Sequence, residues 1–289
     1  MSQWRGPEAP FSLLFDDQDA IGVPLPPPAA AHYAPWPIPL GAERPWVYVN
    51  FVASLDGRVS FDLPGVAGGG AVSDFNPNDQ WLMGLLRARA DAVMVGDNTL
   101  RAEPEHLWTP EYICPQEPGF ADLRRAEGRR ETPLQVIVTL SGEVPDDAQI
   151  FQDSSHRVVI AGTEPGVATA QALLPGHGHI DYLAFGRDSV DLDLLLGQLT
   201  ARYAVHTLLC EGGPTLHGSL VGAGLVDEEF ITLSPMMIGN PHGGPARPGL
   251  LEGVDFTPAD APRLHLAGLL RSGDHLFLRS RYRRAVRVG

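Results

Sequence analysis

Residues 208–218 read LLCEGGPTLHG, an apolar strand that leads through one acid and two glycines into a helix. The adjacent Gly212 and Gly213 lack Cβ atoms, so the backbone can turn tightly there and approach a ligand closely. The helix that follows presents free backbone N–H groups and the positive end of its dipole, which suits a phosphate group. This stretch therefore predicts a nucleotide-binding turn between a strand and a helix.

Apolar segments alternate with amphipathic segments along the rest of the chain. Asn76 and Pro77 are typical of the start of a helix, and the apolar side chains that follow recur at helical spacing. Strands are predicted at 46–53, 92–95, 135–139, 157–161, 206–210 and 230–233, helices at 120–127, 191–203 and 214–223, and a closing antiparallel pair at 264–270 and 275–281. This order predicts an α/β fold with a mostly parallel sheet and helices on both faces.

Five of the predicted strands end in polar or glycine-containing turns. These turns are Ser54–Gly57, Gly96–Thr99, Thr139–Gly142, Ala161–Gly162 and Glu211–Gly213. Ligands of open α/β sheets bind beyond the carboxyl ends of the strands. Because the carboxyl ends of parallel strands meet at one edge, we expect these turns to line a common cleft.

Composition restricts the classes of partner. The formal net charge is −14 and all 21 basic residues are Arg, so nucleic acid and anionic membranes are not expected as partners. The absence of Lys also excludes a Schiff-base lysine and a P-loop. Cys114 and Cys210 lie far apart, which gives no metal-binding motif, so no metal is expected. No apolar run approaches ~20 residues, and the first residues do not resemble a signal peptide, so a cytoplasmic protein is expected.

Residues 1–45 are predicted to form a proline-rich N-terminal arm of irregular structure. Prolines at 24, 26–28, 35, 37 and 39 favour extended backbone. Trp36 and Ile38 are expected to attach this arm to the folded domain, which is assigned to residues 46–289.

Three sequence blocks appear in order along the chain. They are NFVASLDG at 50–57, LRARADAVMVGDNT at 86–99, and EGGPTL at 211–216, which is followed by LVDE at 225–228 and by Pro235 and Gly239. Together these blocks resemble the reductase domain of the riboflavin-biosynthesis deaminase–reductase family, over residues 45–281. The combination at this spacing is specific, whereas each block alone is weak evidence.

The resemblance implies a dihydrofolate-reductase-like fold, NADPH as hydride donor and a homodimer. In that family the reduced position is the ribose carbon of a ribosylaminopyrimidine phosphate. The family's deaminase domain carries His-x-Glu and Pro-Cys-x-x-Cys zinc motifs, which this chain lacks. The expected activity is therefore that of the reductase alone, in a standalone form.

Two positions depart from the family pattern. Asn50 stands where biosynthetic reductases usually carry Lys, and Ala102-Glu103-Pro104 stands where they usually carry Asp-Asp-Pro. Both positions lie near the substrate in the family, so they leave the substrate open. Reduction of dihydrofolate or another pterin is one alternative, and a non-catalytic NADPH-binding protein is another.

The strand-end turns supply the residues expected to bind NADPH. The glycine pair and Thr215 are predicted to contact phosphate, and the guanidinium of Arg101 is a candidate for the 2′-phosphate. An ordinary capped turn remains the alternative interpretation of the Gly96–Thr99 segment. The complete predicted set is Ala53, Gly96, Thr99, Arg101, Thr139, Ser141, Gly162, Gly212, Gly213, Pro214 and Thr215.

The substrate side is assigned to polar residues on the other blocks. Asp79 and Glu103 are the candidate catalytic acids, which would orient the acceptor or relay a proton. Asp79 either completes a capping box with Asn76 or pairs with the 2-amino group and ring N–H of a pyrimidine or pteridine. The predicted substrate-binding residues are Asn50, Ser54, Asp56 and Glu211; for Asp56, a structural role in its turn is the alternative.

Overall fold

The computed structural model describes residues 4–17, 22–39, 43–66 and 68–283. Its strands are β1 (Ser12–Asp16), β2 (Trp46–Ser54), β3 (Ala92–Gly96), β4 (Leu134–Thr139), β5 (Val158–Gly162), β6 (Ile180–Ala184), β7 (Thr207–Cys210), β8 (Glu228–Ser234), β9 (Leu264–Ser272) and β10 (His275–Tyr282). Its helices are α1 (Pro27–Ala30), α2 (Pro77–Ala88), α3 (Asp97–Ala102), α4 (Pro110–Ile113), α5 (Gly119–Ala126), α6 (Gln149–Gln152), α7 (Glu164–Leu173), α8 (Leu192–Tyr203) and α9 (Pro214–Gly222), with a 3₁₀ turn η1 (Gly69–Ala71).

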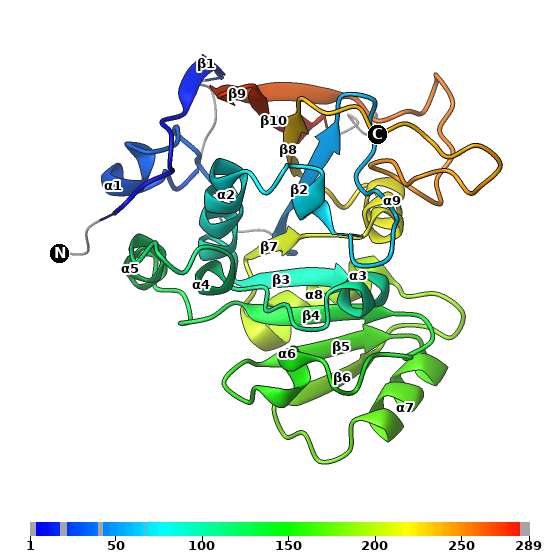
Figure 1. Cartoon of the computed structure of the whole chain (residues 1–289). Coiled ribbons are helices and arrows are strands. Elements are labelled where there is room, and N and C mark those ends of the chain that lie inside the picture. The colour runs from blue at the N-terminus through cyan, green and yellow to red at the C-terminus, as the bar shows by residue number, and fades with distance from the viewer. Residues whose placement is uncertain (1–3, 18–21, 40–42, 67, 284–289) are drawn as a thin grey trace, which may run out of the picture.

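The ten strands form one mixed sheet. The order across the sheet is β1-β9-β10-β8-β2-β7-β3-β4-β5-β6. From β8 to β6 every neighbouring pair is parallel, and β10, β9 and β1 extend the sheet in antiparallel fashion. The predicted α/β class, with a mostly parallel sheet and an antiparallel C-terminal pair, is confirmed. Figure 1 shows the arrowheads of β3, β4 and β5 on the same side of the molecule.

Helix α2 packs on one face of the sheet, and its sequence contains the signals for both its start and its buried side. The Asn76 side chain accepts hydrogen bonds from the N–H groups of Asn78 and Asp79, and Pro77 occupies the first helical position. Trp81 and Leu85 are buried in a core that also contains residues of α5 and of the N-terminal segment. A second core, on the opposite face, joins the leucines of α8 and α9 to the sheet. The parallel strands next to α8 and α9 are therefore covered on both faces.

The N-terminal segment is more regular than the sequence predicted. β1 pairs with β9 at the edge of the sheet, and α1 forms one short helical turn, so the expectation of an irregular arm is wrong at these places. The side chains of β1 are almost all exposed, which removes the apolar alternation that marks a half-buried strand. Trp36 and Ile38 are buried in the first core, as predicted. The division of the chain after residue 45 stays a prediction. In the described residues, no helix is long and apolar enough to cross a membrane.

Candidate active site

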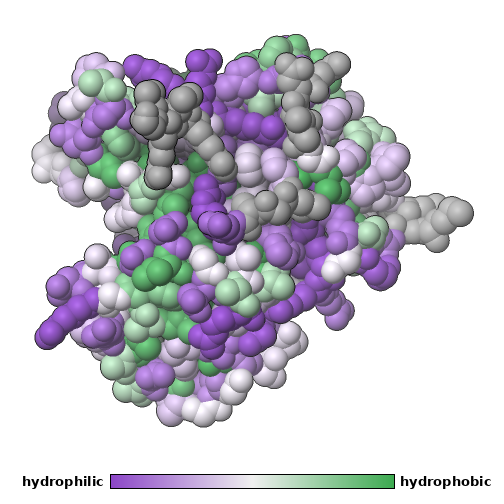
Figure 2. Space-filling view, turned by 180° about the vertical axis from the view of Figure 1, so that it is seen from behind, coloured by the Kyte–Doolittle hydropathy of each residue, from purple (hydrophilic) through white to green (hydrophobic). Residues whose placement is uncertain are grey.

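The five predicted strand ends meet at the carboxyl edge of the parallel strands, although two of them are not turns: Asp97–Thr99 already belong to α3, and Ala161 and Gly162 are the last residues of β5. β2, β7, β3, β4 and β5 are successive neighbours in the sheet, so their ends are adjacent. The Gly96 N–H donates to the Gly212 carbonyl at 2.8 Å, and the Glu211 N–H donates to the Met94 carbonyl at 3.0 Å. The expected common edge is confirmed. Figure 2 shows an indentation in the outline of the molecule at this edge, on the left of the rear view.

Two helices begin at this edge with glycine instead of a capping side chain. Gly96 precedes α3 and Gly213 precedes α9, and neither helix has a side-chain cap, whereas α2, α7 and α8 each have one. A Cβ added to Gly96 would lie 3.8 Å from the Gly213 nitrogen, and one added to Gly213 would lie 3.4 Å from Thr99 Oγ1. Gly212 has a φ of +107°, which favours glycine, and its peptide bond to Gly213 is cis.

This glycine cradle, formed by Gly96, Thr99, Gly212 and Gly213, fits a nucleotide phosphate. Helix N-termini carry N–H donors and partial positive charge, and the missing Cβ atoms leave room for a ligand to approach them. Pro214 opens α9, and Thr215 follows it as an exposed residue. Of the predicted cofactor residues, the structure thus brings together Gly96, Thr99 and the segment 212–215, where the backbone at two helix starts is not covered by side chains.

Two further predicted cofactor residues, Thr139 at the end of β4 and Arg101 in α3, both contact Asp97. Thr139 Oγ1 donates to Asp97 at 2.6 Å and accepts from the Gly142 N–H at 2.9 Å. The Arg101 guanidinium donates to the Asn98 side chain at 2.5 Å and lies 3.3 Å from Asp97. Its side chain is 40% exposed, and it also donates to the Glu143 carbonyl.

The remaining predicted cofactor residues differ in accessibility. Ser141 is exposed and accepts from the Glu143 N–H at 3.2 Å. Ala53 is buried in β2. Gly162 is also buried, and a Cβ there would lie 2.7 Å from the Thr139 carbonyl oxygen, so close strand packing already accounts for this glycine.

Polar side chains gather on the α2 face of the sheet beside the glycine cradle. Asn50 pairs with Phe230 in the β2–β8 ladder, and Thr232 and Ser234 follow at alternate positions of β8 on the same face. The hydroxyls of Thr232 and Ser234 are buried and make no hydrogen bond of normal geometry with the described residues. Sequence reasoning missed both hydroxyls, although two polar residues at alternate positions of an apolar strand are the signal that identifies them.

Asp79 is buried among these groups at the start of α2. Burial raises the pKa of its carboxyl, and the nearby charge of Glu211 adds to this, while the hydroxyls of Thr232 and Ser73 and the His275 ring act in the opposite direction. The capping-box interpretation is not supported, because the Asn76 N–H donates to the Ser73 carbonyl at 3.1 Å. The Asp79 carboxyl therefore faces polar groups of β8 and of the loop before α2.

Glu211 is held by a buried ion pair on the same face. Arg87 Nη2 lies 2.7 Å from Glu211 Oε2, and Arg87 Nε lies 3.1 Å from both carboxyl oxygens. The two side chains are 1% and 7% exposed. The sequence did not predict this partner, which fixes the Glu211 carboxylate next to the Asp79 site.

Replacing Arg87 with Met should destabilise the protein by about 3–5 kcal/mol, because Glu211 would remain as an uncompensated buried charge. The double variant Arg87→Met/Glu211→Gln should recover part of this loss, since it removes that charge as well. Urea unfolding of both variants measures the difference. Equal stability of the single and double variants would contradict the assigned ion pair.

Glu103 lies on the opposite side of Arg87, at the end of α3. Its carboxyl oxygen Oε2 is 3.2 Å from His106 Nδ1, and the hydrogen bond from His106 lowers the pKa of Glu103. A Cβ added to Gly68 would lie 2.0 Å from Glu103 Oε1. The carboxyl therefore contacts the glycine-rich loop that precedes α2.

Ser54 and Asp56 form the turn after β2. Asp56 accepts from the Ile238 N–H at 2.9 Å, from the Ser54 hydroxyl at 2.7 Å and from the Gly239 N–H at 2.7 Å. These bonds lower the pKa of Asp56 to about 2. Both carboxyl oxygens of Asp56 are therefore used within the protein, as expected if Asp56 holds this turn together. A contact between Asp56 and the substrate stays a prediction.

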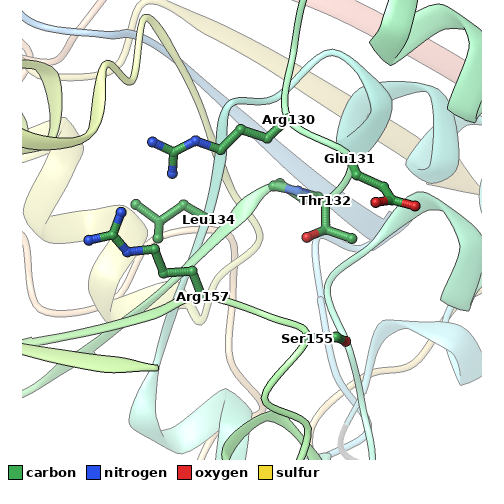
Figure 3. A pocket seen from close by; sticks show the side chains of 7 residues that line it. Arg130, Glu131, Thr132, Leu134, Ser155 and Arg157 are labelled. Atoms are coloured by element: carbon green, nitrogen blue, oxygen red, sulfur yellow. The ribbon is translucent and has the colours of Figure 1, made fainter. Parts of the chain in front are cut away.

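Two surface cavities lie at the other edge of the sheet, near the strand starts. One, of about 510 Å³, is lined by Arg130, Glu131, Thr132, Pro133, Leu134, Ser155 and Arg157 (Figure 3). The other, of about 530 Å³, includes Arg44, Trp46 and Asp227. Neither adjoins the glycine cradle. In the part of the chain that the structure describes, no three His, Cys, Asp or Glu residues form a group that could hold a metal ion.

Comparison with known proteins identifies the family. Residues 45–278 match the model of the RibD C-terminal domain. The chain belongs to this family. The 2,5-diamino-6-ribosylamino-4(3H)-pyrimidinone 5′-phosphate reductase of Archaeoglobus fulgidus is 30% identical over 74% of the chain and 89% of its own length. The protein of the same name from Methanothermobacter thermautotrophicus is 28% identical over 81% of the chain and 97% of its length.

Solved structures share the fold of this chain. A pyrimidine reductase-like protein from Corynebacterium diphtheriae superposes with a TM-score of 0.65 at 23% identity, covering 83% of this chain and 93% of that one. The deaminase/reductase of Thermotoga maritima gives a TM-score of 0.60 at 17% identity, covering 83% of this chain and 57% of that one. These two matches show that the chain has the same fold as both of these proteins.

Proposed function

We propose that this RibD C-terminal family member reduces a ribosylaminopyrimidine 5′-phosphate with NADPH. The observation that carries the proposal is a buried carboxyl, Asp79, on the polar face of the sheet near Glu211, which immediately precedes the glycine pair of the cradle. Related proteins that cover most of the chain are named reductases of such a substrate, which supports the same reaction class.

The glycine cradle is the proposed site for the pyrophosphate of NADPH. Bound there, the cofactor would supply the hydride. The N–H groups at the starts of α3 and α9 would hold the phosphates, and Arg101 with Thr139 and Ser141 would face the adenosine side, including the 2′-phosphate. These residues then contribute binding and orientation, which place donor and acceptor for transfer.

Asp79 is the proposed recognition group for the pyrimidine ring. The relatives' substrate carries a 2-amino group and a ring N–H in a 4(3H)-one, by its printed name. A carboxylate accepts both groups as two parallel hydrogen bonds. The Thr232 hydroxyl contacts the Asp79 carboxyl, and Ser234 lies two residues further along β8 on the same face, where its buried hydroxyl can bond another polar atom of the ring. Asp79 is only 5% exposed, and its carboxyl also contacts the Ser73 hydroxyl.

The direct test follows NADPH oxidation by the purified protein with 2,5-diamino-6-ribosylamino-4(3H)-pyrimidinone 5′-phosphate. We expect turnover with this compound and little or none with dihydrofolate. Dihydrofolate is the informative competitor, because a pterin presents the same 2-amino and ring N–H edge to Asp79. Turnover of dihydrofolate alone would establish the pterin alternative, and NADPH binding without turnover of either compound would establish the non-catalytic one.

A homodimer is part of the proposal and is supported by an apolar face of the sheet. On the α9 side, Ile231 of β8 is in register with Leu278 of β10, which is in register with Leu269 of β9. Leu233 and Leu276 form the next row. All five are only partly buried in the single chain. Such a contiguous apolar face is typical of a subunit interface.

Replacing Leu278 with Asp should convert a dimer to a monomer, because it places a charge in the centre of this face. Light scattering coupled to gel filtration measures the mass, and Leu194→Asp, on the exposed surface of α8, serves as the matched control. A wild-type protein of monomer mass at micromolar concentration would refute the dimer.

A cytoplasmic location completes the proposal. Cys114 and Cys210 are both buried and free. Free thiols are typical of proteins in reducing compartments, which is consistent with this location.

A further inference from the structure

His106 contacts the Glu103 carboxylate through one ring nitrogen and, through the other, the Arg87 guanidinium that binds Glu211. Its Nδ1 lies 3.2 Å from Glu103 Oε2, and its Nε2 lies 2.9 Å from Arg87 Nη2. The ring is held between Trp108 and Tyr112, whose ring centroids lie 5.0 and 4.5 Å away. Its side chain is 14% exposed, so the geometry is fixed by packing as well as by hydrogen bonds.

The contacts of Arg87 determine which nitrogen of His106 carries the proton. Nε and Nη2 bond Glu211, Nη1 donates to the carbonyls of Leu107 and Thr109 at 3.3 and 3.1 Å, and Nη2 also reaches His106. A guanidinium has only donors, so His106 Nε2 must be the acceptor. The proton of the neutral ring is then on Nδ1, where it donates to Glu103.

The resulting chain of contacts crosses the whole substrate side. It begins at Gly68 in the glycine-rich loop, which contacts Glu103, and it ends at Glu211 beside Asp79. Each of its five residues lies in a different segment. In the order of the contacts, these are the loop before α2, the end of α3, the segment before α4, helix α2 and the end of β7. A change at His106 would therefore alter both carboxylates together.

We propose that His106 is a positioning residue of the substrate site, which sets the geometry of Glu103 and of the Arg87–Glu211 pair in the Nδ1–H tautomer. The inference rests on the proposed function, because Glu103 and Glu211 act on the pyrimidine only if the predicted substrate side is correct. His106 touches neither substrate nor cofactor in this assignment. It acts through the groups that it holds.

Three substitutions separate the two bonds of His106. His106→Leu removes both, and we expect kcat/KM for the pyrimidine phosphate to fall ~10–100-fold, as for loss of hydrogen bonds to charged groups, with the Kd for NADPH unchanged. An Asn amide superposes on Nδ1 and a Gln amide on Nε2, so His106→Asn keeps the bond to Glu103 and His106→Gln keeps the bond to Arg87. Each should restore part of the activity.

A measurement that does not depend on turnover tests the role of His106 independently of the proposed function. In ¹⁵N NMR spectra of the wild-type protein, His106 should show a protonated Nδ1 and an unprotonated Nε2; the opposite tautomer would overturn the assignment. His156→Leu is the control, because His156 also pairs with an acid three residues earlier, Asp153, although through Nε2, and it lies far from the proposed substrate side. Equal kcat/KM losses in the His106→Leu and His156→Leu variants would also overturn the inference, whereas no turnover by the wild type would count against the proposed function alone.

Discussion

Replacing Gly213 with Val should raise the Kd for NADPH at least ~100-fold and leave the protein folded, because several charge-assisted hydrogen bonds to phosphate would be lost together. The backbone of Gly213 has a φ of −77°, which a side chain tolerates. The nearest atom to an added Cβ is Thr99 Oγ1 at 3.4 Å. The new isopropyl group would therefore occupy the glycine cradle, where the proposed pyrophosphate would bind, and not the core.

Fluorescence titration with NADPH measures this effect, and thermal unfolding verifies that the variant is folded. Gly197→Val is the matched control, because Gly197 lies in α8 and an added Cβ there meets no atom within 4 Å. It carries the same change of side chain away from the cleft. An unchanged Kd in the Gly213→Val variant would refute the cradle as the cofactor site, whatever the activity of the enzyme.

The sequence was sufficient for the part of the fold that forms the cradle. Its strands are short apolar runs that end in glycine or hydroxyl residues, and such ends are visible without any structure. The elements that were not predicted lack this signal. β6 has an irregular burial pattern, with Ile180 and Leu183 inside, and β1 is exposed along most of its length. Edge strands carry little apolar alternation, so sequence periodicity does not identify them.

The candidate site was predictable as a list of residues but not as a set of contacts. Asp79 and Glu211 were predicted by their positions at a helix start and a strand end. Their surroundings come from residues far away in the sequence: Thr232 lies on β8, and Arg87 binds Glu211 across 124 positions. Which side chain pairs with which depends on the register of β2, β7 and β8, and a one-residue shift would reverse every face.

Replacing Asp79 with Asn should lower kcat/KM for the pyrimidine phosphate ~100-fold or more, the scale of losing hydrogen bonds to a charged group, while the Kd for NADPH stays within about twofold. An amide cannot accept two hydrogen bonds from a 2-amino group and a ring N–H, since one of its two polar atoms is itself a donor. Steady-state kinetics and a cofactor titration measure the two effects. Asp193→Asn is the control, because Asp193 is an exposed first-turn acid of α8.

The same Asp79→Asn variant should be more stable than the wild type at neutral pH. Burial raises the pKa of Asp79, so its carboxyl loses a proton less readily in the folded chain than in the unfolded one. Below the pKa of Asp79 in the unfolded chain, the carboxyl is protonated in both states and does not oppose folding. As the pH rises from there to the higher pKa of the folded chain, the unfolded chain loses its proton first, and this lowers the free energy of unfolding. Asn cannot ionise, so the stability gained by substitution should grow with pH between the unfolded and the folded pKa of Asp79 and vanish in acid.

Urea unfolding at a series of pH values measures this dependence. A variant less stable than the wild type at every pH would indicate that Asp79 serves the fold, whereas lower turnover with higher stability is the combination expected of a charge that is kept buried for binding.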